Sequence, residues 1–241
     1  MLSLTLYAEA SSKQLTLAVG HDHNQMVSAN YPIYRANWEF ITESLSLLDY
    51  EVTPIIVPWA RAKLYVQQAQ ADGLFLAANL EGRDNWAVFS QPLGYGVFGG
   101  FYHINRAENK DLIASVRVGD HDRILAKYHP KELLEVATAQ EGLRLLFLNK
   151  IDRLIMSESY GLFLLDTELN NYKNAIAFDP NMIERRSVHI AFSKEFKSSL
   201  QALDVVNSAI HLGLKSGLYK AAMKRNNVPL RMQLTLPSNR N

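Results

Sequence analysis

The imidazoles of His21 and His23, with the carboxylate of Asp22 between them, are the most chemically suggestive group near the start of the chain. On a strand these two histidines would share one face, as two ligands of one zinc ion would. No third or fourth ligand clusters beside them in the sequence, and the remaining histidines are scattered. We therefore expect a pocket rim or a solvated loop here, and we predict no metal site.

Motifs of several common catalytic sites do not occur in the chain. It lacks the G-x-S-x-G nucleophile elbow, the H-E-x-x-H zinc motif and the P-loop. The glycine-rich run at 94–100 precedes no helix, so we do not expect it to cradle phosphate. Asp120 and Asp122 lack the pattern of a calcium loop. We therefore predict no catalytic residue and no cofactor, and expect a protein that is not an enzyme.

The composition is typical of a globular protein that buries a sizeable core. Of 241 residues, 48% are hydrophobic and 20% are charged, and the chain has no cysteine. The absence of cysteine excludes a disulfide framework, a thiolate zinc site and a lipid-anchored N-terminal cysteine. Lys and Arg total 25 against 24 Asp and Glu, so no basic excess points to nucleic acid.

One uncharged stretch, residues 85–105, is long enough to cross a bilayer. It contains a proline and four glycines, which make a poor lone helix in lipid. We therefore expect buried, extended chain in this region and no membrane insertion.

The elements that must position these groups alternate between strands and helices. Residues 15–19 form an apolar strand, and a helix follows whose apolar side chains share one stripe, at positions 34, 38, 41, 45 and 48. A strand at 51–57, a helix at 59–70 and an apolar strand at 74–78 come next. Short strands that are apolar throughout, separated by helices, predict a parallel or mixed α/β sheet.

The second half repeats this plan. Its expected elements are strands at 112–118, 134–137 and 154–156 and a short helix at 123–128. Thr138 and Glu141 form a capping box that opens a Leu-rich helix. In both halves a helix end is followed by an aspartate, Asp72 or Asp152, and then by an apolar strand. Two similar units predict two lobes rather than one large sheet.

The chain is expected to end in a long helix and a polar tail. The helix has one apolar stripe, made of Leu200, Leu203, Val206, Ile210 and Leu214. Gly217 supplies its stop. Residues 226–241 are polar and interrupted by proline, so we expect a loose tail or a short late strand.

Residues 55–93 read IIVPWARAKLYVQQAQADGLFLAANLEGRDNWAVFSQPL. An aromatic opens the helix, Asp72 precedes an apolar strand, and Glu81 and Arg83 precede F-S-x-P. In this order and spacing the segment resembles the first lobe of the bacterial extracellular solute-binding protein family 3. Together with LTLAVGHD near the start and VHIAFSKEF near the end, the resemblance covers residues 15–225.

This resemblance implies an α/β fold of the type II periplasmic-binding-protein kind, a clamp of two lobes between which the chain crosses twice. We place the crossings at 95–103 and 187–192. Lobe one then comprises residues 1–95 and 193–241, and lobe two comprises residues 96–192. Solute binding in the cleft between the lobes would need no catalysis.

The family's binding residues can be matched to three positions in this half of the chain. Trp59 matches the aromatic that packs on the solute, Arg83 the arginine that pairs with its carboxylate, and Asp22 a polar residue after the first strand. A planar guanidinium suits a carboxylate because it donates two parallel hydrogen bonds. From the residues alone, Trp59 could instead pack in the core, Arg83 could pair with Glu81 or Asp84, and Asp22 could be a turn residue.

Two departures affect the expected solute. The family's acidic partner for an α-ammonium group is Ser157 here, followed by Glu158. The hydroxyl-bearing start of the lobe-two helix falls at 119–120 or 121–122, where an aspartate would repel a carboxylate. We therefore expect a small polar solute that is anionic or amino-acid-like. A ligand sensor and a dehydratase-like enzyme on the same fold are the alternatives.

The resemblance also bears on where the protein works. Ala8-Glu9-Ala10 fits the pattern that precedes a signal-peptidase cut, although an ordinary first strand or tail fits these residues equally well. The family works outside the cytoplasm with uptake systems or receptors. We therefore expect a monomer exported to the periplasm, with a small solute and a membrane transporter or receptor as partners.

Overall fold

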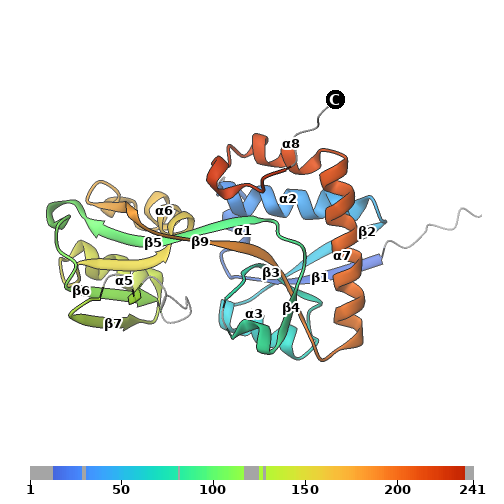
Figure 1. Cartoon of the computed structure of the whole chain (residues 1–241), viewed down its shortest axis with the longest axis horizontal. Coiled ribbons are helices and arrows are strands. Elements are labelled where there is room, and N and C mark those ends of the chain that lie inside the picture. Colours follow the sequence, from blue (N-terminus) through green and yellow to red (C-terminus); the bar gives the residue numbers. More distant parts are fainter. Residues whose placement is uncertain (1–12, 29–30, 81, 117–124, 127–128, 237–241) are drawn as a thin grey trace, which may run out of the picture.

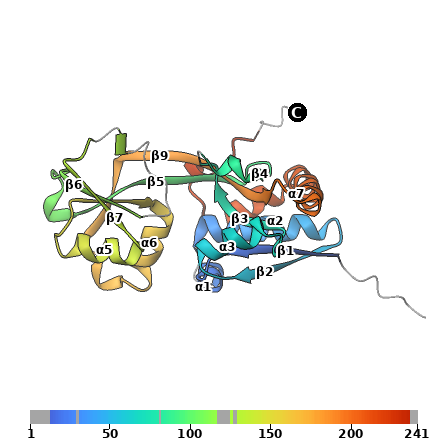
Figure 2. The ribbon, with the colours of Figure 1, turned by 90° about the horizontal axis from the view of Figure 1, so that it is seen from below.

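The structure, a computed structural model, describes residues 13–28, 31–80, 82–116, 125–126 and 129–236. The chain forms two α/β bodies, and Figure 1 shows two long strands running from one body to the other. The turned view in Figure 2 shows the same two strands side by side. The predicted two-lobe clamp with two crossings is therefore confirmed.

Lobe one contains both ends of the described chain. Its strands are β1 (Lys13–Val19), β2 (Tyr50–Ile56), β3 (Gly73–Ala78) and β4 (Ala87–Phe89). Its helices are α1 (His23–Ser28), α2 (Pro32–Ser46), α3 (Trp59–Gln67), α7 (Lys197–Lys215) and α8 (Leu218–Arg225). β1 lies between β2 and β3 and is parallel to both, so the predicted β-α-β order gives the expected parallel core.

Lobe two repeats this arrangement on a smaller scale. Its strands are β6 (Leu112–Val116), β7 (Glu132–Val136) and β8 (Arg153–Ser157), with β6 parallel to both others. Its helices are α5 (Ala139–Phe147) and α6 (Glu158–Asp166). The predicted cap is present, because the Thr138 hydroxyl accepts a hydrogen bond from the Glu141 backbone N–H.

The two crossings are β5 (Gly94–His103) and β9 (Ile176–Ser193), which pair antiparallel from Gly94 opposite Val188 to His103 opposite Ile176. They join both lobes into one sheet with the order β2-β1-β3-β9-β5-β8-β6-β7, and β4 pairs with β9. The second crossing is longer than the predicted 187–192. Most of the stretch 85–105 is extended, as expected, since residues 87–89 and 94–103 form strands, although its two ends belong to short 3-10 helices. Among the described residues no helix is long and apolar enough to span a membrane.

The glycines of β5 are required by close packing more than by hinge angles. A Cβ on Gly99 would lie 2.1 Å from the carbonyl oxygen of Met182, and one on Gly100 would lie 2.4 Å from its sulfur. Neither glycine has a positive φ, whereas Gly94, where the crossing begins, has a φ of 155°. The two crossing strands therefore approach more closely than side chains would allow.

The buried face of α7 differs from the predicted leucine stripe. Val206 and Ile210 are buried as expected, but Leu200 is 41% exposed. Small residues such as Ala202 and Gly213 form the rest of the contact. A Cβ on Gly213 would lie 2.0 Å from the Ser44 hydroxyl on α2. The stripe is displaced because α2 and α7 pack too closely for large side chains.

The predicted loose tail is wrong for the part of it that the structure describes. Residues 226–236 fold back on lobe one, and a short 3-10 helix spans Leu230–Met232. Met232 is buried in the core, and the Leu234 backbone N–H donates to the Tyr219 hydroxyl over 2.8 Å. A buried methionine and a satisfied backbone group fix this polar segment in place.

Candidate functional site

The strand registers show which edges of the two sheets face each other. In lobe one, Leu74 pairs with Ala191 and Ala78 with Val188, so β3 runs toward lobe two as β9 runs away from it. In lobe two, Leu154 pairs with Phe101 and Ser157 with Phe98, so β8 runs toward lobe one. The carboxyl ends of both parallel sheets therefore meet at the junction, where α/β sheets place their ligands.

The three predicted site residues of lobe one each follow the carboxyl end of a parallel strand. Asp22 lies three residues after β1, Trp59 three residues after β2, and Arg83 five residues after β3. In lobe two, Ser157 ends β8 and Glu158 begins α6. All five predicted residues thus belong to the edges that face the junction.

Trp59 is the first residue of α3 and follows Pro58. Its ring is half-buried and packs against a cluster of small apolar side chains that includes Ala18 and Ala62. Trp59 therefore packs against the core with one part of its ring and leaves another part exposed.

Arg83 begins a short 3-10 helix directly after Gly82, whose φ of 79° turns the chain. Its Nη1 donates to the carbonyl oxygen of Ala78, at the end of β3, over 2.6 Å. Burial, followed by the neighbouring charge of Arg83, lowers the pKa of Lys63. Two cations therefore lie near each other beside α3, an arrangement that favours an anion.

β3 itself is irregular just before Arg83. Leu76 has a φ of 55°, which is strained for a branched side chain, and the pairing with β9 shifts register between Leu74 and Ala77. A bulge of this kind redirects the chain after the strand.

Asp22 is buried and connects the two lobes. One carboxylate oxygen accepts a hydrogen bond of 2.7 Å from the hydroxyl of Tyr160, on α6 of lobe two. The other oxygen lies 2.7 Å from Nε2 of His21. Burial and the hydrogen bond to Asp22 both raise the pKa of Tyr160. Asp22 is therefore neither solvated nor a simple turn residue.

Ser157 and Glu158 are also engaged at the junction. The Ser157 hydroxyl caps α6 by accepting from the Tyr160 backbone N–H over 3.4 Å. Oε1 of the buried Glu158 lies 2.5 Å from Nη2 of Arg231. Burial raises the pKa of Tyr31, while hydrogen bonds to Ser159 and Ser157 oppose that rise. The end of β8 is thus bonded to lobe-one residues.

The structure brings Asp22, Ser157 and Glu158 into one bonded group, and it places Trp59 and Arg83 beside α3 and the end of β3. No pattern in the sequence pointed to the residues that complete the first group, which are Tyr31, Tyr160 and Arg231. Each is far in sequence from its partner. The predicted positions Glu81, Gly119, Asp120, His121 and Asp122 lie outside the described residues.

The two histidines beside Asp22 have separate partners. His21 bonds to Asp22, whereas Nδ1 of the buried His23 lies 2.8 Å from the Tyr34 hydroxyl and its ring packs edge-on to Trp38. Within the described part of the chain, no three His, Asp or Glu side chains are grouped as metal ligands. The imidazoles therefore serve hydrogen bonding and packing.

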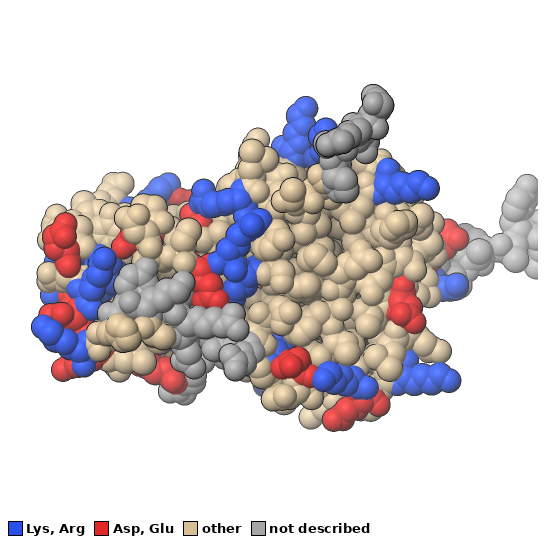
Figure 3. Space-filling view, in the orientation of Figure 1, with Lys and Arg blue, Asp and Glu red and all other residues tan. Residues whose placement is uncertain are grey.

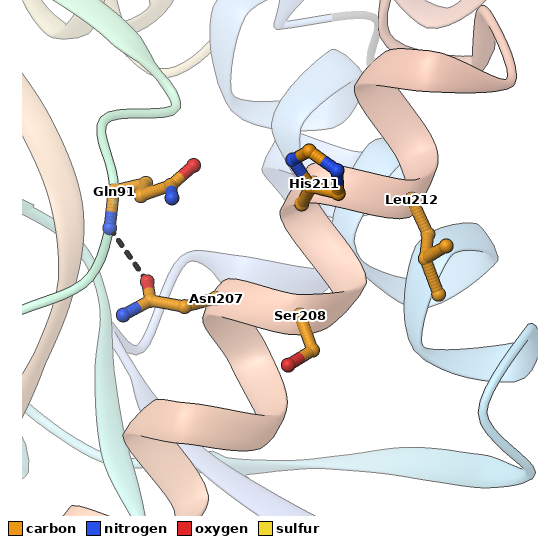
Figure 4. Close-up of a pocket in the computed structure, with 5 residues that line it drawn as sticks. All are labelled: Gln91, Asn207, Ser208, His211 and Leu212. Atoms are coloured by element: carbon orange, nitrogen blue, oxygen red, sulfur yellow. Dashed lines mark hydrogen bonds between the residues drawn. The ribbon is translucent and has the colours of Figure 1, made fainter.

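Charged side chains of both signs meet at the boundary between the two bodies, while much of the visible face of lobe one is uncharged (Figure 3). That lobe also has a shallow hollow of about 430 Å³ beside α7. Figure 4 shows its lining side chains, with the Gln91 backbone N–H donating to Asn207 over 2.8 Å. None of the five predicted residues lines this hollow.

Comparisons with known proteins identify the fold through solved structures. No family model and no curated protein sequence matches the chain. A histidine kinase sensor domain with similarity to periplasmic binding proteins superposes with a TM-score of 0.69 at 16% identity, covering 88% of this chain and 95% of that one. A substrate-binding protein of an ABC uptake transporter from Streptococcus pneumoniae, with bound histidine, gives 0.70 at 12% identity, covering 93% and 96%.

A third solved structure extends the comparison to a receptor. The GluR0 ligand-binding core from Nostoc punctiforme, in complex with L-glutamate, gives a TM-score of 0.66 at 14% identity and covers 89% of this chain and 100% of that one. Each match spans both lobes. The chain therefore has the type II periplasmic-binding-protein fold, as its sequence resemblance implies.

Proposed function

We propose that this chain is an extracytoplasmic solute-binding protein that captures a small carboxylate-bearing solute between its two lobes. The observation that carries the proposal is the meeting of both carboxyl sheet edges at the junction, with every predicted site residue on those edges. Structural neighbours with this fold bind histidine and L-glutamate, which supports a small polar solute here.

Trp59 and Arg83 supply the recognition in this proposal. The half-exposed indole offers a flat apolar surface, and the guanidinium offers charge-assisted hydrogen bonds to a carboxylate. Lys63 adds a second positive charge near Arg83. The solute therefore has a planar or apolar body and at least one anionic group.

We also propose where the protein works and which partner receives its solute. The protein works as a periplasmic monomer and passes its solute to an ABC transporter, as neighbours with the same fold are transporter components. In this proposal lobe one comprises residues 1–95 and 193–241 and lobe two comprises residues 96–192, and the antiparallel pairing of the two crossing strands β5 and β9 supports that division. Residues 8–10 precede a signal-peptidase cut.

A sensor is the second candidate function. The likeness to a histidine kinase sensor domain over both lobes supports it, and solute capture is the same in both cases. Co-purification with a permease rather than a kinase or receptor would distinguish the transport role. A dehydratase-like enzyme would instead convert cyclic carboxylates to aromatic products when incubated with them, and we expect no such product.

A thermal-shift screen against organic acids, amino acids and polyamines tests the proposal. A solute at 100 times its dissociation constant adds about 2.7 kcal/mol to the free energy of unfolding. For a chain of this size we expect the midpoint to rise by roughly 5–10 °C. Stabilisation by carboxylates and none by polyamines supports the proposal, whereas stabilisation by polyamines alone would contradict it.

A further inference from the structure

The C-terminal segment Pro229–Leu234, which we call the strap, is fixed to lobe one at several points. Met232 is buried, and the Leu234 backbone N–H donates to Tyr219 on α8. The Gln233 amide donates to the carbonyl oxygen of Val228 over 2.7 Å. The strap is therefore part of the lobe-one surface that faces lobe two.

From this position the strap bonds directly to lobe two. Nη2 of Arg231 lies 2.5 Å from Oε1 of Glu158 on α6. The Ser159 hydroxyl lies 3.6 Å from the sulfur of Met232. Nη2 of Arg185, on β9, donates to the carbonyl oxygen of Gln233 over 3.4 Å. Contacts with α6 of lobe two and with the crossing strand β9 make the strap a connection between the lobes.

The Glu158 carboxylate requires a positively charged partner because it is buried. Its side chain is only 8% exposed, and a buried carboxylate without a positive partner is strongly unfavourable. Its second oxygen, Oε2, is buried and has no hydrogen-bond partner among the described residues. Arg231 is therefore the one positive partner within salt-bridge distance that the described residues give to this carboxylate.

Asp22, the other acid among the predicted site residues, is also occupied. Its two oxygens are taken by Tyr160 and by His21. Both carboxylates at the junction, of Glu158 and Asp22, therefore already have partners within the protein.

We propose that Arg231 is a tethered cation that takes, at Glu158, the place a solute's ammonium group would occupy, so that the protein selects carboxylates without an α-amino group. The selectivity for such solutes rests on the proposed function, whereas the pairing of Arg231 with Glu158 does not. A tethered partner competes at an effective concentration near the millimolar range, which a free ammonium group must exceed to displace it.

Removing the tethered cation and restoring it from solution tests the first part. In Arg231→Ala, the buried Glu158 loses its partner, and we expect the unfolding midpoint to fall by roughly 4 °C. Methylguanidinium chloride at about 20 mM should restore at least half of that loss, while the same concentration of NaCl should not. The double variant Arg231→Ala/Glu158→Gln should not respond to methylguanidinium.

Arg225→Ala is the matched control. Arg225 is similarly exposed and pairs with Glu39 and Glu43 within lobe one, on more exposed carboxylates. Methylguanidinium should therefore not restore its stability. No restoration in Arg231→Ala, or equal restoration in Arg225→Ala, would overturn the tethered-cation role, and neither result depends on which solute the protein binds.

A matched pair of solutes tests selectivity. 3-Phenylpropionate and phenylalanine share one body and differ in the α-ammonium group, so titration calorimetry on both isolates that group. We expect wild type to bind the acid at least tenfold more tightly, and Arg231→Ala to narrow the ratio. Tighter binding of phenylalanine by wild type would overturn the proposed selectivity. Binding of neither would count against the proposed solute class, while the restoration experiment would still decide the role of Arg231.

Discussion

The two lobes build the same unit from different residues, and the unit differs where the lobes face each other. In each, a first strand lies between two parallel neighbours. In each, an aspartate directly precedes the third strand, and its carboxylate accepts a hydrogen bond from a backbone N–H of the first strand. Asp72 accepts from Thr16 over 2.7 Å and Asp152 from Leu112 over 3.0 Å. Just after the helix that precedes each aspartate lies a left-handed residue, Ala69 or Asn149.

Beyond the aspartates the units diverge. β3 is bulged at the strained Leu76 and leads through a loop to Arg83. β8 pairs with β5 and β6 without a register shift and passes directly into α6 through the capping Ser157. Lobe one therefore presents a cation and an aromatic ring at its edge, whereas lobe two presents a helix start with a buried acid. The shared frame provides stability, and the edges provide recognition.

Replacing Asp72 and Asp152 in turn should give the largest difference in stability between the two lobes. Asp152 also lies 2.6 Å from Nη2 of Arg106 and beside the buried Arg153, whereas Asp72 bonds to the Thr16 backbone and hydroxyl. We expect Asp152→Asn to lower the free energy of unfolding by about 2–3 kcal/mol and Asp72→Asn by about 1 kcal/mol. Urea unfolding measures both, and equal losses would show that the ion pair adds nothing.

The second largest effect should be a pH dependence of stability that arises from His23 in lobe one. Burial lowers the pKa of His23 in lobe one, so the unfolded chain takes up a proton first as the pH falls below about 6.5. The stabilisation is full above that pH and is lost as the pH falls toward the folded value. We expect wild type to lose about 1 kcal/mol more than His23→Gln between pH 7 and pH 5.5.

Tryptophan fluorescence assigns that loss to a lobe, because Trp38, Trp59 and Trp86 all lie in lobe one. Urea unfolding curves followed by fluorescence at the two pH values, for wild type and His23→Gln, make the comparison. Identical pH dependence in both proteins would remove His23 as its cause.

Glycine substitutions at the left-handed residues after the two helices should give the smallest difference in stability. Alanine is strained in the left-handed conformation that Ala69 adopts with a φ of 54°, while asparagine tolerates the similar φ of 55° at Asn149. Ala69→Gly should therefore stabilise the protein by about 0.5–1 kcal/mol, and Asn149→Gly should change stability by less than about 0.3 kcal/mol. Thermal unfolding of the two variants would contradict this account if Asn149→Gly gained more.

The sequence predicted the repeated frame because local patterns determine it. Apolar strands, the aspartate after each helix and the Thr138 cap are all short-range features, and each lies where it was expected. The buried face of α7 was less predictable. Hydropathy favours large residues such as Leu200, whereas the contact with α2 depends on the absence of a side chain at Gly213.

At the junction between the lobes, too, the sequence predicted only the residues that a local pattern marks. Asp22, Ser157 and Glu158 were identified because each follows a predicted strand. Arg231 was not, since 73 residues separate it from Glu158 and its segment is polar and contains a proline. Tyr160 bonds to Asp22 across 138 residues. Long-range pairs of this kind follow from how the lobes meet, which no local pattern encodes.

The role of Arg83 as the anion site tests the central claim most directly. Titration calorimetry with a carboxylate found by the screen should show that Arg83→Ala weakens binding by about tenfold to a hundredfold, with little change in the melting of the protein alone. Arg61→Ala, which removes the same charge from an exposed position on α3, should leave the affinity unchanged. Unchanged affinity in Arg83→Ala, with a loss of stability instead, would contradict the account.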